Sequence, residues 1–332
     1  MQFLKKHILN IYILLFLALL HISCEERIDS SLLSGEPVLT INALITDQKG
    51  PYYVRITKSS SDLQKEFNIE QGLAISRKFE AINNATVTMN DDQGNIDTLE
   101  FWNVNLTENP SLGEWIDQGI YRTKHLQGVA GRTYTLTVVY EGKVYQSVAT
   151  IPSSPPTINE VKYTRSQDPI NDSRVPLVSF EESQNYKNYY RFFYIPYSVN
   201  STTNELTSIG GWSDGPNNFW QLVSPQIFIF DDQLLPAKVK NLKLEDDGIT
   251  SQELPSPNSF SPAIKIKVEI QIHSISKEAY EYFSSIKEQL LFTPNRPFSS
   301  APASPPTNIS NGGLGFFSAS SVKSILIDGP QN

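Results

Sequence analysis

The stretch TYTLTVVYEGKVYQSV, residues 133–148, gives the clearest indication of the fold. Large apolar residues alternate with threonines from Thr133 to Tyr140, and this period of two is typical of a strand with one buried face. Glu141-Gly142-Lys143 then offers a tight turn, because glycine adopts a positive φ without steric penalty. A second strand follows over Val144–Val148, so the stretch predicts a β-hairpin.

Residues 36–151 repeat this pattern at short intervals. Gly94 lies in an Asp- and Asn-rich turn, Asp91–Asn95, which predicts a second hairpin. Several short strands in this length indicate an immunoglobulin-like β-sandwich. The further strands predicted in this part are Val38–Ile45, Tyr52–Ile56, Ala85–Met89 and Ile96–Phe101.

A proline-rich run at residues 152–157 predicts a linker, because proline cannot donate to a β-ladder. Residues 158–332 then predict a second β-rich domain with one helix near 276–290, capped by Ser276. A Pro/Gly-rich loop and a closing strand near Ser321–Ile327 follow the helix. The other strands expected here are Glu160–Tyr163, Val175–Phe180, Tyr189–Val199, Gln226–Phe230 and Ile264–Ile272.

The first 23 residues have the layout of a signal peptide, with two lysines before the apolar run Ile11–Leu20. This run is shorter than the roughly 20 residues that span a bilayer. Cys24, the only cysteine, follows the small residue Ser23 as in a bacterial lipobox, although His21 stands where leucine is usual. We therefore expect residues 1–23 to be removed, Cys24 to carry palmitate or a similar lipid, and residues 24–35 to form a flexible tether. The alternative is a free thiol at Cys24.

The composition favours a binding protein over an enzyme. The net charge is −8 and becomes −10 without the two leader lysines, which does not suit nucleic acid. Outside the leader there are two histidines, His125 and His273, and neither lies in a catalytic motif. We therefore expect no catalytic residues, no metal and no cofactor. Acidic pairs lie in predicted turns, where aspartate bonds its own backbone, so we favour structural roles over cation binding for Asp91-Asp92, Asp231-Asp232 and Asp246-Asp247.

The segment Ser208–Val223 places Trp212, Phe219 and Trp220 among Gly, Asn and Asp residues. Exposed rings beside amides would form a platform for a glycan or a peptide. The alternative is that the rings fold back as a small core beneath a long loop, because large aromatic residues dominate burial.

Several segments together resemble the Bacteroidota lipoprotein family catalogued as domain of unknown function 4249. The resemblance implies an outer-membrane lipoprotein that often accompanies a TonB-dependent transporter, and it brings no established catalytic residues. Residues 36–151 also resemble the carboxypeptidase regulatory-like modules of such systems. The segments that carry the family resemblance are Gly35–Leu39, Gly119–Tyr121, Gly131–Tyr134, Phe228–Asp232, Ser276–Tyr282, Asn295–Ser300 and Asn308–Phe317.

Two further expectations depend on this resemblance. Glu25 and Glu26 directly after the cysteine resemble a surface-export signal of Bacteroidota lipoproteins, which favours the cell surface over the periplasmic face. The C-terminal loop is expected to dock on a barrel partner through Gly312, Gly313, Gly315 and Phe316, and the alternative is a tight crossover within the chain. The sequence names neither the ligand, the transporter nor the oligomeric state.

Overall fold

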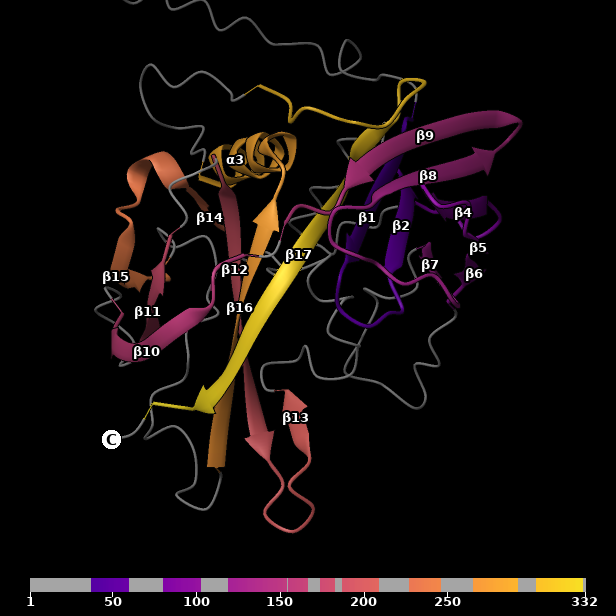
Figure 1. Ribbon diagram of the computed structural model, residues 1–332. Helices are drawn as coiled ribbons and strands as arrows, with labels where there is room; N and C mark the ends of the chain where they lie inside the picture. Colours follow the sequence, from indigo (N-terminus) through magenta and orange to yellow (C-terminus); the bar gives the residue numbers. More distant parts are fainter. Residues whose placement is uncertain are drawn as a thin grey trace, which may run out of the picture. The chain divides into compact units, whose positions relative to one another are not determined.

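A computed structural model describes residues 37–59, 80–102, 119–153, 155–166, 174–182, 187–208, 227–245, 265–291 and 303–330 (Figure 1). Over these residues the chain is mainly β with one α-helix, which confirms the predicted fold class. The strands are β1 (Leu39–Thr46), β2 (Tyr53–Lys58), β3 (Glu80–Ala81), β4 (Thr86–Asp91), β5 (Ile96–Thr98), β6 (Glu100–Phe101), β7 (Ile120–Arg122), β8 (Thr133–Tyr140), β9 (Lys143–Thr150), β10 (Ile158–Arg165), β11 (Arg174–Glu181), β12 (Tyr189–Val199), β13 (Leu206–Ser208), β14 (Phe228–Asp231), β15 (Lys238–Lys243), β16 (Lys265–Ile275) and β17 (Leu314–Asp328).

The strands form three sheets. Sheet A has ten strands in the order β13-β12-β16-β17-β1-β2-β7-β6, with β14 also on β12 and β3 also on β2. Sheet B has the order β5-β4-β8-β9, and sheet C the order β10-β11-β15. The predicted turns are present as well: Gly94 has a φ of 87°, and Glu141 and Gly142 between β8 and β9 have φ values of 48° and 74°. Two positive φ angles in a two-residue loop match the twist of the hairpin.

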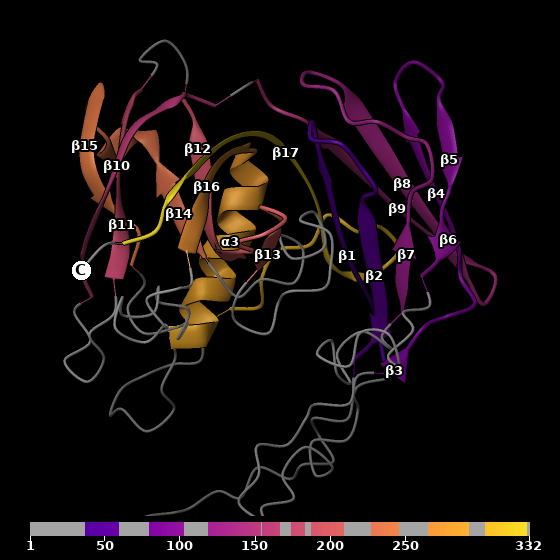
Figure 2. The same ribbon diagram turned by 90° about the horizontal axis from the view of Figure 1, so that it is seen from below.

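Sheet B packs on one half of sheet A and makes the predicted β-sandwich (Figure 2). Alternate residues of each strand face the first core, because side chains along a strand point to opposite faces. Ile41 and Val54 of sheet A lie in this core with Leu136 and Val138 of sheet B, and none of the four is more than 1% exposed.

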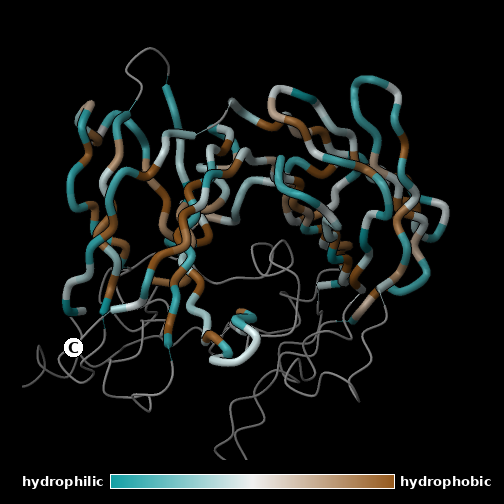
Figure 3. Tube along the Cα trace, turned by 60° about the horizontal axis from the view of Figure 1, so that its bottom comes forward, coloured by the Kyte–Doolittle hydropathy of each residue, from teal (hydrophilic) through white to brown (hydrophobic). Residues whose placement is uncertain are grey.

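Sheet C packs on the other half of sheet A and encloses a second core. Phe192 and Ile270 of sheet A meet Val178 and Phe180 of sheet C there, and all four are buried. The hydrophobic segments in Figure 3 follow the strands of the two cores, whereas hydrophilic segments occupy the turns. Strands β7, β13 and β15, which have little periodic pattern in the sequence, complete the sheets.

Strand β17 belongs to both halves of sheet A. From Leu314 to Ser320 it pairs in parallel with β1, and from Ser320 to Asp328 it pairs antiparallel with β16. Phe317 accordingly lies in the first core, while Ile325 packs against the second. The sequence predicted a β-sandwich from residues 36–151 alone. The observed sandwich also includes β17, which lies far along the chain. The division at residues 152–157 stays a prediction.

The point where β17 leaves β1 is fixed by side chains of the turn after β1. The Asp47 carboxylate accepts from the Val322 N–H at 2.8 Å, and the Gln48 amide donates to the Val322 carbonyl at 3.2 Å. Ser321 Oγ also donates to the carbonyl of Ser153 at 2.6 Å. These hydrogen bonds hold β17 at the point where its backbone pairing with β1 ends.

The helix, α3 (Lys277–Leu291), confirms the predicted one. The Ala279 N–H donates to Ser276 Oγ at 3.2 Å, so Ser276 caps the helix as expected, and Glu278 lies in the first turn. Ala279 is 1% exposed and faces sheet A. Within the described part of the chain, no helix has the length and apolar content needed to cross a membrane.

Candidate functional site

The face of sheet A that points away from both cores is polar and aromatic, and we call it the polar face. The strand registers place Asn42, Arg55, Phe193 and Gln271, among others, on the same side of the sheet. Its central residues are largely enclosed, although sheets B and C pack on the opposite side. The residues on this face include Asn42, Tyr53, Arg55, Arg191, Phe193, Tyr197, Glu269, Gln271, His273, Phe316, Ser318 and Ser320.

A chain of hydrogen bonds runs along the polar face on β16. Tyr197 OH donates to Glu269 Oε2 at 3.0 Å, and Gln271 Nε2 donates to Glu269 Oε1 at 3.0 Å. Because a carboxylate only accepts, the Gln271 amide oxygen must point the other way, where it lies 3.2 Å from His273 Nε2. His273 Nε2 therefore carries the proton, and Nδ1 accepts from Ser320 Oγ at 2.9 Å.

His273 is a buried, neutral imidazole. Burial, followed by the charge of Arg191, lowers its pKa from 6.5 to about 3. Ser320, its hydroxyl partner, has no exposed surface. This His–Ser pair has the hydrogen bond of a nucleophile and its base, but the hydroxyl is closed to a substrate.

Arg191 lies directly opposite His273 in the strand register. Its guanidinium carbon is 4.4 Å from the ring centroid of Phe193 and 4.0 Å from that of Phe283 on α3. Burial lowers the Arg191 pKa to about 9, so this side chain is still a cation at neutral pH. The flanking rings partly offset the desolvation of the charge by cation–π attraction.

Helix α3 covers one end of the polar face. The Tyr282 ring stacks on Phe316 with centroids 4.7 Å apart, and Tyr282 OH donates to Asn42 Oδ1 at 3.3 Å. The Tyr280 ring contacts the Tyr189 ring with centroids 5.1 Å apart and the ring planes tilted by 38°. The helix thus attaches to β1, β12 and β17 through the side chains of Tyr280 and Tyr282.

The sequence-predicted sites have different outcomes. Cys24 lies outside the described residues, and so do Trp212, Phe219 and Trp220. The segment with these three aromatic residues follows β13 and precedes β14, and both strands hydrogen-bond to β12. The predicted glycan or peptide platform stays a prediction.

The predicted docking loop makes contacts within the chain. Gly315 has a φ of 91°, and a Cβ there would lie 2.2 Å from the Ile41 carbonyl oxygen, so glycine permits the close approach of β17 to β1. Phe316 is 6% exposed beneath Tyr282, and Gly312 has a φ of 74° with open space around it. A Cβ on Gly313 would meet Ile309 and Tyr145. Docking on a partner stays a prediction.

The same loop closes the free edge of β9. The Ser310 N–H donates to the Gln146 carbonyl at 2.8 Å, and the Gln146 N–H donates to Ser310 Oγ at 2.7 Å. Asn308 holds the loop to β17, since its side chain accepts from the Phe317 N–H and donates to the Phe317 carbonyl. An exposed strand edge is a site of aggregation, and this loop covers part of it.

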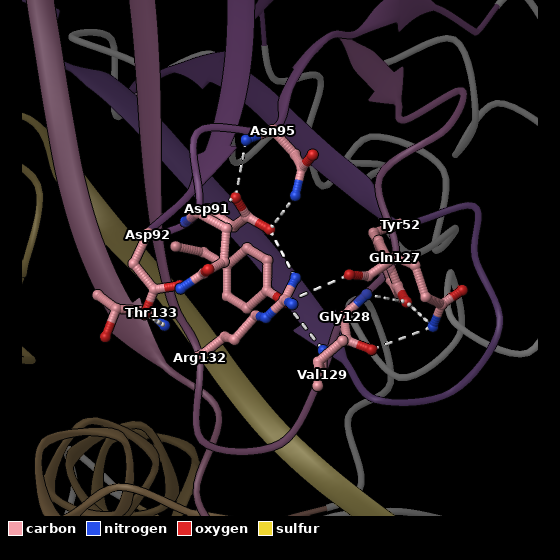
Figure 4. A network of polar contacts seen from close by, with 11 residues as sticks. Tyr52, Asp91, Asp92, Asn95, Gln127, Gly128, Val129, Arg132 and Thr133 are labelled. Atoms are coloured by element: carbon pink, nitrogen blue, oxygen red, sulfur yellow. Dashed lines mark hydrogen bonds and ion pairs between the residues drawn. The ribbon is translucent and has the colours of Figure 1, made fainter.

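Asp91 has a structural role in the β4–β5 hairpin (Figure 4). Its carboxylate accepts from the backbone N–H groups of Gln93 and Asn95 and pairs with Arg132 at 2.9 Å. Burial raises the Asp91 pKa, but these hydrogen bonds and Arg132 outweigh it, so the pKa is lowered. A second network in Figure 4 joins Tyr52 OH to the Gly128 N–H at 2.9 Å.

The other candidates from the sequence are two acidic pairs and His125. Asp231 accepts from the Gln233 N–H at 2.9 Å and begins a short 3-10 helix, η3 (Asp232–Leu234), whereas Asp246 and Asp247 lie outside the described residues. His125 is exposed. Across the ranges that the structure describes, no three His, Cys, Asp or Glu side chains are grouped as metal ligands.

Sequence reasoning did not identify Arg191, Phe193 or Glu269 as parts of a site. A signal was present, since Arg191 is the one charged residue in the run YYRFFYIPYSV, residues 189–199. A cation inside an otherwise aromatic and apolar strand indicates a polar environment on one face. The partners of that face come from β1, β16 and α3, and no local pattern links them.

Comparison with family models agrees with the family named from the sequence. No curated protein matches the chain. Residues 25–325 match a family described as Domain of unknown function (DUF4249), which spans both cores, α3 and nearly all of β17. The chain belongs to this family, DUF4249.

Proposed function

We propose that this protein is a non-enzymatic lipoprotein of the outer membrane that captures a nutrient for a TonB-dependent uptake system. The observation that supports capture is the polar face, where acceptors, donors and rings are held in place by strands. Binding sites combine apolar and aromatic surface with a few placed polar groups. The burial of Ser320 supports binding over nucleophilic catalysis.

The anchor is the first part of this proposal to test. Labelling cells with a palmitate analogue should mark the wild-type protein and leave a Cys24→Ala variant unmarked. Protease treatment of intact cells should degrade the protein if it faces the exterior, as Glu25 and Glu26 favour. Label that persists in Cys24→Ala would remove the anchor from the proposal.

The partner is tested by affinity purification of the tagged protein from detergent-solubilised outer membranes, followed by mass spectrometry. The expected result is co-purification of a TonB-dependent barrel protein in stable proportion. A Gly312→Asp variant alters the predicted docking loop at a position with open space around it, so it should weaken recovery of the barrel without unfolding the chain. Recovery of the lipoprotein without any barrel protein would contradict the partnership.

Direct capture of a glycan or peptide by Trp212, Phe219 and Trp220 is a second candidate. The position of β13 and β14 on either side of this segment, both on β12, favours it. Replacement of all three residues by alanine should abolish ligand binding measured by calorimetry. Unchanged affinity would exclude these rings.

A further inference from the structure

The side of sheet B that points away from sheet A carries no charge, and we call it the threonine face (Figure 2). It consists of the residues of β4, β5, β8 and β9 that alternate with the core residues. These are threonine, valine, asparagine, glutamine and isoleucine, and no charged or aromatic side chain lies among them in these described strands. The chain as a whole has a net charge of −8 and is 19% charged residues, so this face differs from the rest of the chain.

The threonine face also exposes large apolar side chains to water. Ile96, Val139, Val144 and Val148 are 37 to 72% exposed, and Val139 is the register partner of Val144. Single exposed apolar residues are ordinary on a protein surface, whereas a group of them on one face marks a contact surface.

The hydroxyl groups among these apolar residues have partners within the face. Thr133 Oγ1 lies 2.8 Å from Thr150 Oγ1, and Gln146 Nε2 donates to Thr137 Oγ1 at 3.3 Å. A polar group that keeps a hydrogen bond costs less to remove from water than one that loses it. The threonine methyl groups therefore add to the apolar surface that a partner can cover.

The shape and chemistry of the threonine face narrow the class of partner. One side of a sheet is an open surface, whereas small molecules bind in concave sites. The face lacks the aromatic rings that a glycan platform would use. β-branched side chains pack well on a pleated surface, and two such surfaces stack face to face in sandwiches. The best match is therefore another sheet of the same composition.

We propose that a second copy of this chain packs on the threonine face, sheet against sheet, in a weak two-fold dimer. Two copies carry the same net negative charge, and contact through an uncharged face avoids placing like charges opposite each other. At about 3.4 Å per residue and about 4.8 Å between strands, the face covers roughly 400 Å². Two copies together bury about 800 Å², which is in the range of weak, transient contacts. This self-association does not depend on the proposed anchor or transporter.

Sedimentation of the full chain in a density-matched detergent tests the proposal. The wild-type chain should show a monomer–dimer equilibrium between about 1 and 100 μM. Val148→Lys places a cation on the face of both copies and should weaken the dimer at least about 10-fold. Leu326→Lys on β17, at a position that is 44% exposed, is the matched control and should dimerise like the wild type.

A charge swap at the same position separates a lost contact from a lost fold. Val148→Lys and Val148→Glu should each sediment as a monomer, and their equimolar mixture should recover the dimer at low salt. The recovery follows because opposite charges then lie on the two faces in contact. Variants that fail to fold would not form a dimer on mixing.

Ionic strength gives an independent readout. Added salt should strengthen the wild-type dimer, because it screens only the repulsion between the two net charges. A dimer that weakens with salt, or one that Val148→Lys and Leu326→Lys affect equally, would overturn the proposal. A wild-type chain that stays monomeric at about 100 μM would also overturn it, and would leave the threonine face to a different protein.

Discussion

At the scale of single residues, one buried carboxylate accepts hydrogen bonds from three consecutive backbone N–H groups of a loop. Asp97 on β5 is 4% exposed, and its Oδ2 accepts from the backbone N–H groups of Lys124, His125 and Leu126 at 2.8, 2.6 and 2.8 Å. Burial raises the Asp97 pKa, but the three hydrogen bonds together outweigh it, and the pKa is lowered. The charge therefore stabilises the folded state.

Asp97→Asn should lower the free energy of unfolding at pH 7 by about 1–3 kcal/mol, because hydrogen bonds to a neutral amide oxygen are weaker. The folded-state pKa is below the unfolded value of about 3.9, so this stabilisation is present above that pH and disappears as the pH falls through the folded pKa. Urea denaturation at pH 7 and pH 3 measures the difference. The exposed Asp92→Asn is the control, and an equal loss at both pH values would contradict the assignment.

The buried His273 should give the free energy of unfolding a second dependence on pH. Its pKa is about 3 in the folded state and about 6.5 when unfolded, so the unfolded chain binds a proton first as the pH falls. Stability attributable to this residue is therefore full above pH 6.5 and declines below it, by about 2 kcal/mol at pH 5. His273→Gln should flatten the decline between pH 7.5 and pH 5, and the exposed His125→Gln should not. An imidazole of His273 that titrates near pH 6 by NMR would refute the assignment.

At the scale of elements, the close approach of β17 to β1 depends on one glycine. Gly315→Ala would place a Cβ 2.2 Å from a β1 carbonyl at a φ of 91°, so backbone must move. We expect a loss of more than about 3 kcal/mol in the free energy of unfolding. Gly312→Ala, at a φ of 74° but in open space, is the matched control and should lose only about 1 kcal/mol. Similar losses for both variants would mean that the approach to Ile41 does not matter.

Local elements were predictable from the sequence, and long-range pairings were not. The β8–β9 hairpin and α3 have complete local signals, namely alternation with a glycine turn and apolar spacing with a serine cap. The parallel pairing of β1 with β17 joins residues such as Asn42 and Phe316 across most of the chain. Nothing in either strand specifies that partner. The candidate site depends on such pairings, and so Arg191 and Glu269 were not predicted together.

At the scale of the whole molecule, β17 links the stability of the two cores. A chain that ends at residue 313 loses the strand that lies between β1 and β16 and pairs with both. We expect it to lack a cooperative thermal transition by circular dichroism. A chain that ends at Pro330 keeps β17 and should unfold like the full chain. A normal transition for either core in the shorter chain would show that the core is independent of β17.

The position of β17 also determines when the protein can fold. A ribosome makes the N-terminal end first, so β1 and β2 emerge long before the strand that pairs with β1 in parallel. Pairings of such wide sequence separation form slowly, because the intervening chain must first close into a loop. Sheet A is therefore completed only when synthesis is nearly finished. The export proposed above needs an unfolded chain, and this order of strands delays the completion of sheet A until β17 has been made.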